Sequence, residues 1–296
     1  MGPARAGSNA LTTTATYLSI QNNLARYQKM TAAEPAVKNA TKYYTANVSK
    51  VTSAKALVSN YRMLSYAMQA YGLGAYVNDT ALVTKVLNGG VTNPRALANT
   101  LTTGNWNAFA KAYDFVDKGA TKPTKASAVA ATTAAYTEQQ LESDQGQTDP
   151  GVQLALYFKR VAPTVTSSYS ILGDQNLLEV VQTAFGLAPT SNASQIDAEA
   201  KAIDKLVPLK TLQNPTKLNN LTERFTANYD AQYGPAGTGG SLTVKTGNAS
   251  ATNVNASSSI LAGIVSSNGT ALSSVLGTDP YASAFAATLS ALALGG

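Results

Sequence analysis

Two short stretches of this chain resemble each other and limit how it can fold. Each begins with a residue that caps helices, Asn60 or Asp174, and reaches a glycine twelve positions later, Gly72 or Gly186. Asn and Asp accept hydrogen bonds from the free N–H groups of a helix start, and glycine adopts the left-handed conformation that ends many helices. The closing tetrapeptides, AYGL and AFGL, differ at one position. The sequence therefore predicts the same capped helix twice.

Apolar residues recur within both stretches at the spacing of one helix face. The first stretch carries Tyr61, Leu64, Met68 and Tyr71, and the second carries Leu177, Leu178, Val181 and Phe185. We expect Leu64, Met68 and Tyr71 to be buried, together with Leu178, Val181 and Phe185. Truncating such buried side chains typically costs ~2–5 kcal/mol.

The resemblance continues downstream in the same order. The pentapeptide NPRAL (93–97) is matched by NPTKL (214–218), and Asn-Pro is a strong helix start because proline lacks the N–H that would be unpaired there. An aromatic pattern follows each, Phe109 with Tyr113-Asp114 and Phe225 with Tyr229-Asp230. Further core positions are expected at Leu97, Phe109, Tyr113, Leu218, Phe225 and Tyr229. Three matches in one order predict two related helical modules.

Helical periodicity extends over the rest of the body. An N-terminal apolar face carries Tyr17, Ile20, Leu24 and Tyr27, while Glu34-Pro35 and Asp149-Pro150 are helix starts. Sustained strand alternation is absent up to Tyr233, so we predict an all-α fold. The predicted regions are a flexible leader (1–16), a first helical module (17–120), a helical linker (121–148), a second helical module (149–233), and a linker with a C-terminal amphipathic tail (234–296).

The tail is the candidate interaction element. Gly, Ser, Thr and Asn dominate the stretch after Tyr233, which is typical of a flexible linker. Two short amphipathic helices are predicted beyond it, with apolar faces formed by Ile260, Leu261, Ile264 and Val265 and by Tyr281, Phe285, Leu289 and Leu292. An apolar helix face must be buried. The tail therefore packs either on its own body or on a second chain, and both readings stay open.

Composition removes most familiar catalytic chemistry. The 296 residues include no cysteine and no histidine, which excludes disulfides, thiolate nucleophiles, imidazole bases and the usual zinc sites. Glu138 and Glu142 lie four apart on one predicted helix face, but no histidine completes a di-metal motif. We interpret them as a solvated face and predict no catalytic, metal or cofactor-binding residue. A glycan hydrolase, which needs only two carboxylates, stays as a second alternative.

Charge and targeting signals are weak. The formal net charge of +6 comes from scattered lysines without a dense run, so no nucleic-acid partner is expected. No segment reaches the ~18 consecutive apolar residues that a membrane span requires. The N-terminus also lacks the apolar run of a cleaved signal peptide. Both a cytoplasmic location and export without cleavage agree with these features.

Three stretches resemble a known family. They are TAAEPAVKNATKYYTANVSKVTSAKAL, YAMQAYGLGAYVNDTALVTKVLNGGVTNPRALANTLTTGNWNAFAKAYDF, and GVQLALYFKRVAPTVTSSYSILGDQNLLEVVQTAFGL continued through NPTKLNNLTERFTANYD. Over about residues 17–230 the chain is similar to an alphaproteobacterial family of proteins of unknown function encoded among flagellar genes. It departs after Leu73, where members usually carry an acidic pair and this chain has GAY. The family has no established catalytic residues to transfer.

The resemblance implies a flagellar association, and the composition agrees with it. Flagellar axial proteins are similar in lacking cysteine, in being rich in Ala, Thr, Ser and Asn, and in having apolar termini that order on assembly. We therefore expect a non-enzymatic structural or assembly protein of the flagellum. Its expected partners are flagellar proteins or copies of itself, with no small-molecule substrate. The alternative is a cytoplasmic chaperone or regulator of flagellar assembly.

Overall fold

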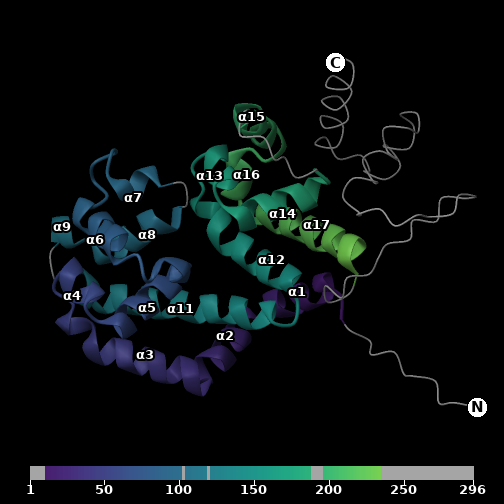
Figure 1. The fold of residues 1–296 in the computed structure, drawn as a ribbon. Helices are drawn as coiled ribbons and strands as arrows, with labels where there is room; N and C mark the ends of the chain where they lie inside the picture. The colour runs from purple at the N-terminus through teal and green to yellow at the C-terminus, as the bar shows by residue number, and fades with distance from the viewer. Residues whose placement is uncertain (1–10, 102–103, 119–120, 188–195, 235–296) are drawn as a thin grey trace, which may run out of the picture.

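The fold consists of helices joined by short loops. The computed structural model describes residues 11–101, 104–118, 121–187 and 196–234 (Figure 1). Within these ranges there are helices and no strand, so the predicted all-α fold is confirmed. The helices are α1 (Thr13–Asn22), α2 (Leu24–Ala33), α3 (Pro35–Asn47), η1 (Val48–Lys50), α4 (Ala54–Val58), α5 (Tyr61–Ala70), η2 (Gly74–Tyr76), α6 (Thr80–Gly89), α7 (Leu97–Thr100), α8 (Gly104–Tyr113), α9 (Phe115–Lys118), α10 (Thr121–Thr124), α11 (Ala126–Gly146), α12 (Pro150–Val161), η3 (Ala162–Thr164), α13 (Ser168–Leu172), α14 (Gln175–Phe185), α15 (Ile196–Leu206), α16 (Leu209–Leu212) and α17 (Pro215–Tyr233).

The two predicted capped helices are α5 and α14, and both are confirmed. The Asn60 side chain accepts a hydrogen bond from the Met63 N–H, and the Asp174 side chain accepts from the N–H groups of Asn176 and Leu177. Both helices end at a glycine with positive φ, 71° at Gly72 and 63° at Gly186.

The C-terminal ends of α5 and α14 each contain the same type of hydrogen bond. The leucine after each glycine donates its N–H back across the last turn, from Leu73 to the Met68 carbonyl and from Leu187 to the Gln182 carbonyl, each at 2.8 Å. This bond defines a Schellman motif, which explains why the repeated tetrapeptide ends in Gly-Leu.

The Asn-Pro match, by contrast, is wrong in its first copy. Asn214 caps α17 through a bond from the Lys217 N–H, as predicted. Asn93 instead accepts from the Arg95 N–H, and its carbonyl accepts from the Ala96 N–H, which makes a turn rather than a helix start. The four-residue helix α7 begins only afterwards.

The two Tyr-Asp pairs also occupy different positions in their helices. Asp114 ends α8 with a φ of 35°, whereas Asp230 lies within the long helix α17. The equivalence of the two modules as wholes stays a prediction: serine caps α4 and α13 alike and the caps of α5 and α14 agree, but the matches downstream of them do not.

Most of the predicted core is buried. The confirmed positions are Leu64, Met68, Phe109, Tyr113, Val181, Phe185, Leu218, Phe225 and Tyr229. Tyr71, Leu97 and Leu178 are partly buried and pack against the edges of the core. Tyr61, which the spacing placed on the same apolar face as Leu64 and Met68, is 63% exposed. It is the first residue of α5.

Buried side chains form two clusters that define two lobes. The first lobe contains α3 to α9, and the second contains α1 and α12 to α17. Helix α11 runs along both (Figure 1), with Tyr136 in the first cluster and Leu141 in the second. The stretch predicted as a helical linker is helical, and it is also a shared wall of both cores.

Helix α1 belongs to the second lobe, although the sequence analysis placed most of it in the first module (17–120). It packs on α12 and α17, and its Tyr17 and Ile20 belong to the second cluster. It also begins at Thr13, inside the stretch expected to be a flexible leader, because the Thr12 side chain caps it by accepting from the Ala15 N–H. Residues 1–10 lie outside the described residues.

Candidate functional site

The sequence-predicted interaction residues cannot be placed. Ile260, Leu261, Ile264, Val265, Tyr281, Phe285, Leu289 and Leu292 all lie outside the described residues. The structure does describe the point from which this part of the chain departs, the end of α17. That point is next to the start of α1 (Figure 1).

Two carboxylates hold the start of α1 against the second lobe. Asp230 on α17 accepts hydrogen bonds from the backbone N–H groups of Thr13 and Thr14, at 2.7 and 2.9 Å. Asp149 accepts from the Thr13 hydroxyl at 2.9 Å and also caps α12 by accepting from the Gly151 N–H at 2.9 Å. We call Thr13, Asp149 and Asp230 the terminal clamp. It ties the first described helix to the last one.

The physics of the clamp is that of helix capping. The first N–H groups of a helix have no partner within it and carry the positive end of the helix dipole, so a carboxylate stabilises them. Asp149 is 3% exposed, and the hydroxyl of Thr13 and the N–H groups of α12 satisfy it. The clamp is therefore a structural arrangement. The carboxylate oxygens of Asp149 and Asp230 all accept hydrogen bonds from groups at the starts of α1 and α12.

Helices α1 and α17 lie antiparallel beyond the clamp. Thr222 on α17 lies close to the Tyr17 phenol, one turn along α1 from the clamp. Burial raises the pKa of Tyr17 to about 12, so this phenol is neutral at physiological pH. The pKa of Tyr229 is also raised to about 12, by burial and then by the nearby Asp149 carboxylate. Neither phenol acts as a base at neutral pH.

The carboxylates Glu138 and Glu142 do not form a solvated face. Glu142 is 3% exposed and pairs with Arg160 on α12, which donates to both carboxylate oxygens at 2.6 and 2.8 Å. Arg160 also donates to the Gln139 side chain at 2.9 Å. Glu138 accepts from Gln28 on α2 at 3.0 Å. The solvated-face interpretation is wrong because α12 and α2 cover this side of α11.

A buried pair of hydrogen bonds, separate from the ion pair of Glu142 and Arg160, joins the two lobes. Tyr157 on α12 donates to Asp174 at 2.5 Å and accepts from Asn105 on α8 at 3.4 Å. Burial, followed by the Asp174 charge, raises the pKa of Tyr157. Because Asn105 belongs to the first lobe and Tyr157 to the second, this chain of bonds fixes their relative position.

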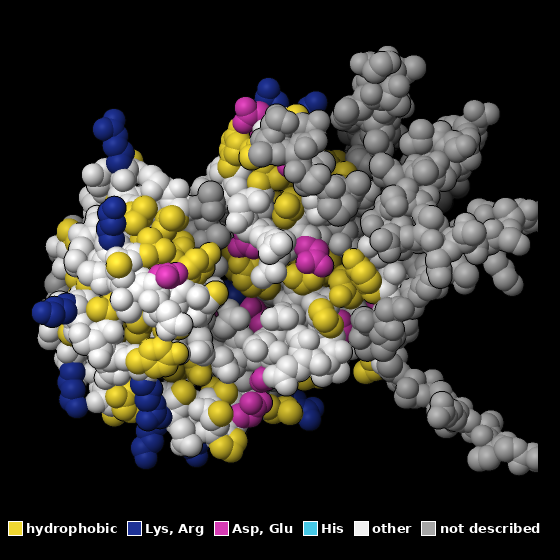
Figure 2. Space-filling model, in the orientation of Figure 1, with side chains coloured by type: hydrophobic (Ala, Val, Ile, Leu, Met, Phe, Trp, Pro, Cys, Tyr) yellow, Lys and Arg dark blue, Asp and Glu magenta, His cyan; other side chains and the backbone are white. Residues whose placement is uncertain are grey.

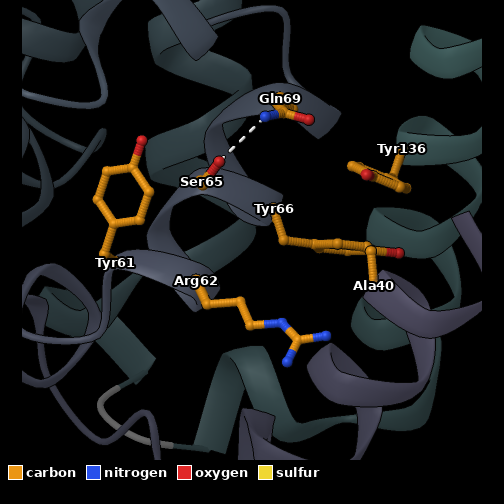
Figure 3. A pocket seen from close by; sticks show the side chains of 7 residues that line it. All are labelled: Ala40, Tyr61, Arg62, Ser65, Tyr66, Gln69 and Tyr136. Carbon is orange, nitrogen blue, oxygen red and sulfur yellow. Dashed lines mark hydrogen bonds between the residues drawn. The ribbon is translucent and has the colours of Figure 1, made fainter. Parts of the chain in front are cut away.

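A cavity on the first lobe also has the shape of a binding site. A cavity of about 170 Å³ opens on the first lobe between α3, α5 and α11. Figure 3 shows Tyr61, Arg62, Ser65 and Tyr66 projecting from α5, with Ala40 on α3 and Tyr136 on α11 across from them. No cluster of three or more acidic side chains that suits a metal ion occurs among the described residues. In the same part of the chain, no helix combines the length and apolar character needed to cross a membrane.

Sequence reasoning missed the clamp and the cavity for different reasons. Thr12 and Thr13 directly precede the apolar face that begins at Tyr17, which is a recognisable helix start. Asp230 stood out in the sequence because Tyr-Asp occurs at matching places in both predicted modules. Its hydrogen-bond partner Thr13, however, lies 217 residues away and could not be inferred. The cavity joins three helices and has no local signature.

Comparison with known proteins gives a family and a fold. The family described as "Protein of unknown function (DUF1217)" matches residues 70–218, half of the chain. A crystal structure of a protein from Agrobacterium tumefaciens, a structural genomics target, is 31% identical, with a TM-score of 0.68. The similarity covers 78% of this chain and 98% of that one. No curated protein matches. The length of the family match and this identity over nearly the whole of the solved protein establish that the chain belongs to the DUF1217 family of proteins of unknown function.

Proposed function

We propose that this protein is a non-enzymatic structural or assembly protein of the bacterial flagellum that acts through protein–protein contacts. The observation that carries the proposal is the terminal clamp. Asp230 binds the first N–H groups of α1. Residues 1–10 therefore join the body at the same end as residues 235–296. Two terminal segments that start from one place can reach a single partner surface together.

The sequence of the C-terminal segment supports a role in contacts. It contains the two predicted apolar helix faces around Ile264 and Phe285 behind a linker rich in small polar residues. Isolated helices this short are marginal in water, so they gain order when they pack. The ordering cost keeps such a contact reversible. Linking two weak contacts at one point also raises their combined affinity without any new interaction.

The flagellar part of the proposal rests on the resemblance described above and on composition. The chain has neither histidine nor cysteine, and its charged residues make up 13%, about half the usual share, with Ala, Thr, Ser and Asn in their place. The described carboxylates that looked most like catalytic groups, Glu138 and Glu142, are engaged with Gln28 and Arg160. A scaffold that presents terminal segments accounts for all of these features.

The direct test is removal of residues 241–296 from the chromosomal copy, with a tag for detection. We expect the truncated protein to keep the helical content and melting temperature of the body but to disappear from sheared flagella and to abolish swimming. A finer test replaces Leu261 and Ile264 with aspartate. Its charge-matched control places the same aspartates at Ser258 and Ser267, which lie outside the predicted apolar face.

Two outcomes would contradict this proposal. Normal swimming by cells with the truncated protein, still found with the flagella, would show that the tail is not the interaction element. Full-length protein confined to the cytosol of motile cells would instead favour a chaperone or regulator of assembly.

A further inference from the structure

The cavity on the first lobe has a rigid aromatic wall. Tyr66 on α5 stacks between Tyr44 and Tyr136, with ring centroids 4.5 and 3.9 Å apart. Its hydroxyl is 3.1 Å from the Thr41 hydroxyl. Stacking on both faces and a hydrogen bond at the tip fix the ring. Because Tyr66 is 4% exposed, only the edge of this fixed ring lines the cavity, and a ligand does not have to order it.

A guanidinium group stands at the cavity mouth. Arg62 lies 3.9 Å above the ring centroid of Tyr43, and the Tyr43 hydroxyl is held by the Asn60 side chain at 3.2 Å. Among the described carboxylates none forms an ion pair with Arg62, since the pairing of Arg160 with Glu142 is the ion pair found there. The cation is thus positioned by an aromatic ring but not neutralised.

The segment that carries α3 and α5, two of the three walls of the cavity, has charge of one sign, while Glu138 on the third wall, α11, is engaged by Gln28. Between positions 35 and 78 the chain has five cations, Lys38, Lys42, Lys50, Lys55 and Arg62, and no carboxylate. Figure 2 shows Lys and Arg side chains projecting from the side of the molecule that carries α3 to α9. Like charges on one face raise the local concentration of anionic partners and speed their association.

We propose that this cavity binds a peptide segment of a partner protein that carries a carboxylate next to an aromatic side chain. The aromatic side chain enters the cavity beside Tyr61 and meets the edge of the Tyr66 ring, and the carboxylate pairs with Arg62. A volume of about 170 Å³ admits a single ring, because cavities of about 150 Å³ bind benzene. Tyr61, which is 63% exposed, covers one side of the bound segment.

The lining favours a peptide over a simple anion. A small anion gains nothing from contact with the exposed Tyr61 ring and the edges of Tyr66 and Tyr136, whereas an aromatic side chain does. Ser65 and Gln69, joined by a 3.0 Å hydrogen bond at the rim, supply polar groups for a peptide backbone. This site lies on the first lobe, away from the terminal clamp, and the proposal does not rest on a flagellar location.

The test uses the purified full-length chain and small probes. Binding of N-acetyl-Asp-Phe-amide is followed by NMR chemical shifts, beside N-acetyl-Asn-Phe-amide, N-acetyl-Asp-Ala-amide and inorganic phosphate. We expect the Asp-Phe probe to bind about fivefold more tightly than either single-feature probe, and to weaken as salt is raised. Phosphate should not displace it at equal concentration.

Variants locate the binding. Arg62→Gln should remove the preference for Asp-Phe over Asn-Phe, and Ser65→Leu, which narrows the cavity, should weaken both phenylalanine probes. Arg95→Gln, an exposed cation of the same lobe outside the cavity, is the matched control and should change nothing. Melting curves establish that each variant is folded. Equal binding of all the dipeptides, displacement by phosphate, or an unchanged preference in Arg62→Gln would overturn the proposal.

Discussion

The Asp230 carboxylate accepts the Thr13 backbone N–H at 2.7 Å, although 217 residues separate them. The Thr14 N–H donates to the second oxygen of the same carboxylate at 2.9 Å. A side chain in the last turns of the described body thus caps its first helix. The contact acts on α1 as an N-cap does, but the cap comes from a different element.

Loss of this carboxylate should loosen α1 before the rest of the body. Asp230→Asn keeps one acceptor oxygen but removes the charge and the second bond, which should cost about 1–2 kcal/mol. Urea unfolding measures the loss, and hydrogen exchange should show faster exchange at Thr14 and Tyr17. Asp204→Asn, an exposed carboxylate of the second lobe, is the control and should stay within about 0.5 kcal/mol of the parent.

The absence of a side chain at Gly151 is required by the packing of three helices. A methyl group there would lie 2.5 Å from Cδ1 of Tyr229 and 2.7 Å from Cγ2 of Thr13. Gly151→Ala should therefore destabilise the protein by about 1–3 kcal/mol, because neither the buried Tyr229 ring nor the Thr13 side chain, which Asp149 holds, can move freely.

Gly146→Ala provides the matched comparison for Gly151. The new methyl group would meet the side chain of Gln153, whose flexible end can swing away. Helix propensity then favours alanine by about 1 kcal/mol, so we expect no loss of stability. Similar melting temperatures for the two alanine variants would contradict the close packing of α1, α12 and α17.

The buried ion pair should show strong coupling between its partners. Glu142→Leu or Arg160→Leu alone leaves a charge without its partner and should cost about 3–5 kcal/mol. The double variant removes both charges and should be clearly more stable than either single variant. A double-mutant cycle in guanidinium chloride measures this coupling. Additive losses would mean that the pair contributes little.

The stability of the protein should decrease above the usual pKa of glutamate because of Glu138. Burial raises the pKa of Glu138 above its ordinary 4.5, against the opposing effect of Arg160. A group whose pKa is higher in the folded state contributes stability below the unfolded pKa and loses it as pH rises through the folded pKa. Glu138→Gln should therefore flatten the stability profile just above pH 4.5. An unchanged slope in that window would show that Glu138 does not cause it.

The two aromatic residues Phe225 and Tyr61 should differ sharply in their effect on stability. Phe225 is fully buried, so Phe225→Ala should cost about 3–5 kcal/mol. Tyr61→Ala should change stability by less than about 0.5 kcal/mol, because the side chain is 63% exposed. Thermal melts of both variants check the pair. A destabilised Tyr61→Ala would show that this ring packs on the body.

Local signals in the sequence predicted the helices but not their neighbours. The caps at Asn60 and Asp174 and the glycines that follow were readable because every atom involved lies within one turn. The Asn93-Pro94 start failed although it has the same local signal as Asn214-Pro215. Its Asn side chain bonds two residues ahead and closes a turn, and tertiary context decides between these outcomes.

Distant partners explain the remaining errors. Nothing near Glu142 in the sequence indicates that Arg160, on the next helix, will bury it. The same holds for α1, whose apolar face was evident while its packing partner, α17, lay at the other end of the described body. The cavity beside Arg62 needs α3, α5 and α11 together, so it could not be predicted before they were assembled.

The antiparallel arrangement of α1 and α17 has a mechanical consequence. Tension applied between the two terminal segments would enter the body at Thr13 and Asp230 and would act across these bonds first. Because the two helices run in opposite directions from that point, their contacts would break one after another, as in a zipper, rather than in shear. The first lobe and its cavity lie outside this initial load path. A pulled subunit would therefore release α1 at low force while the cavity beside Arg62 kept its shape.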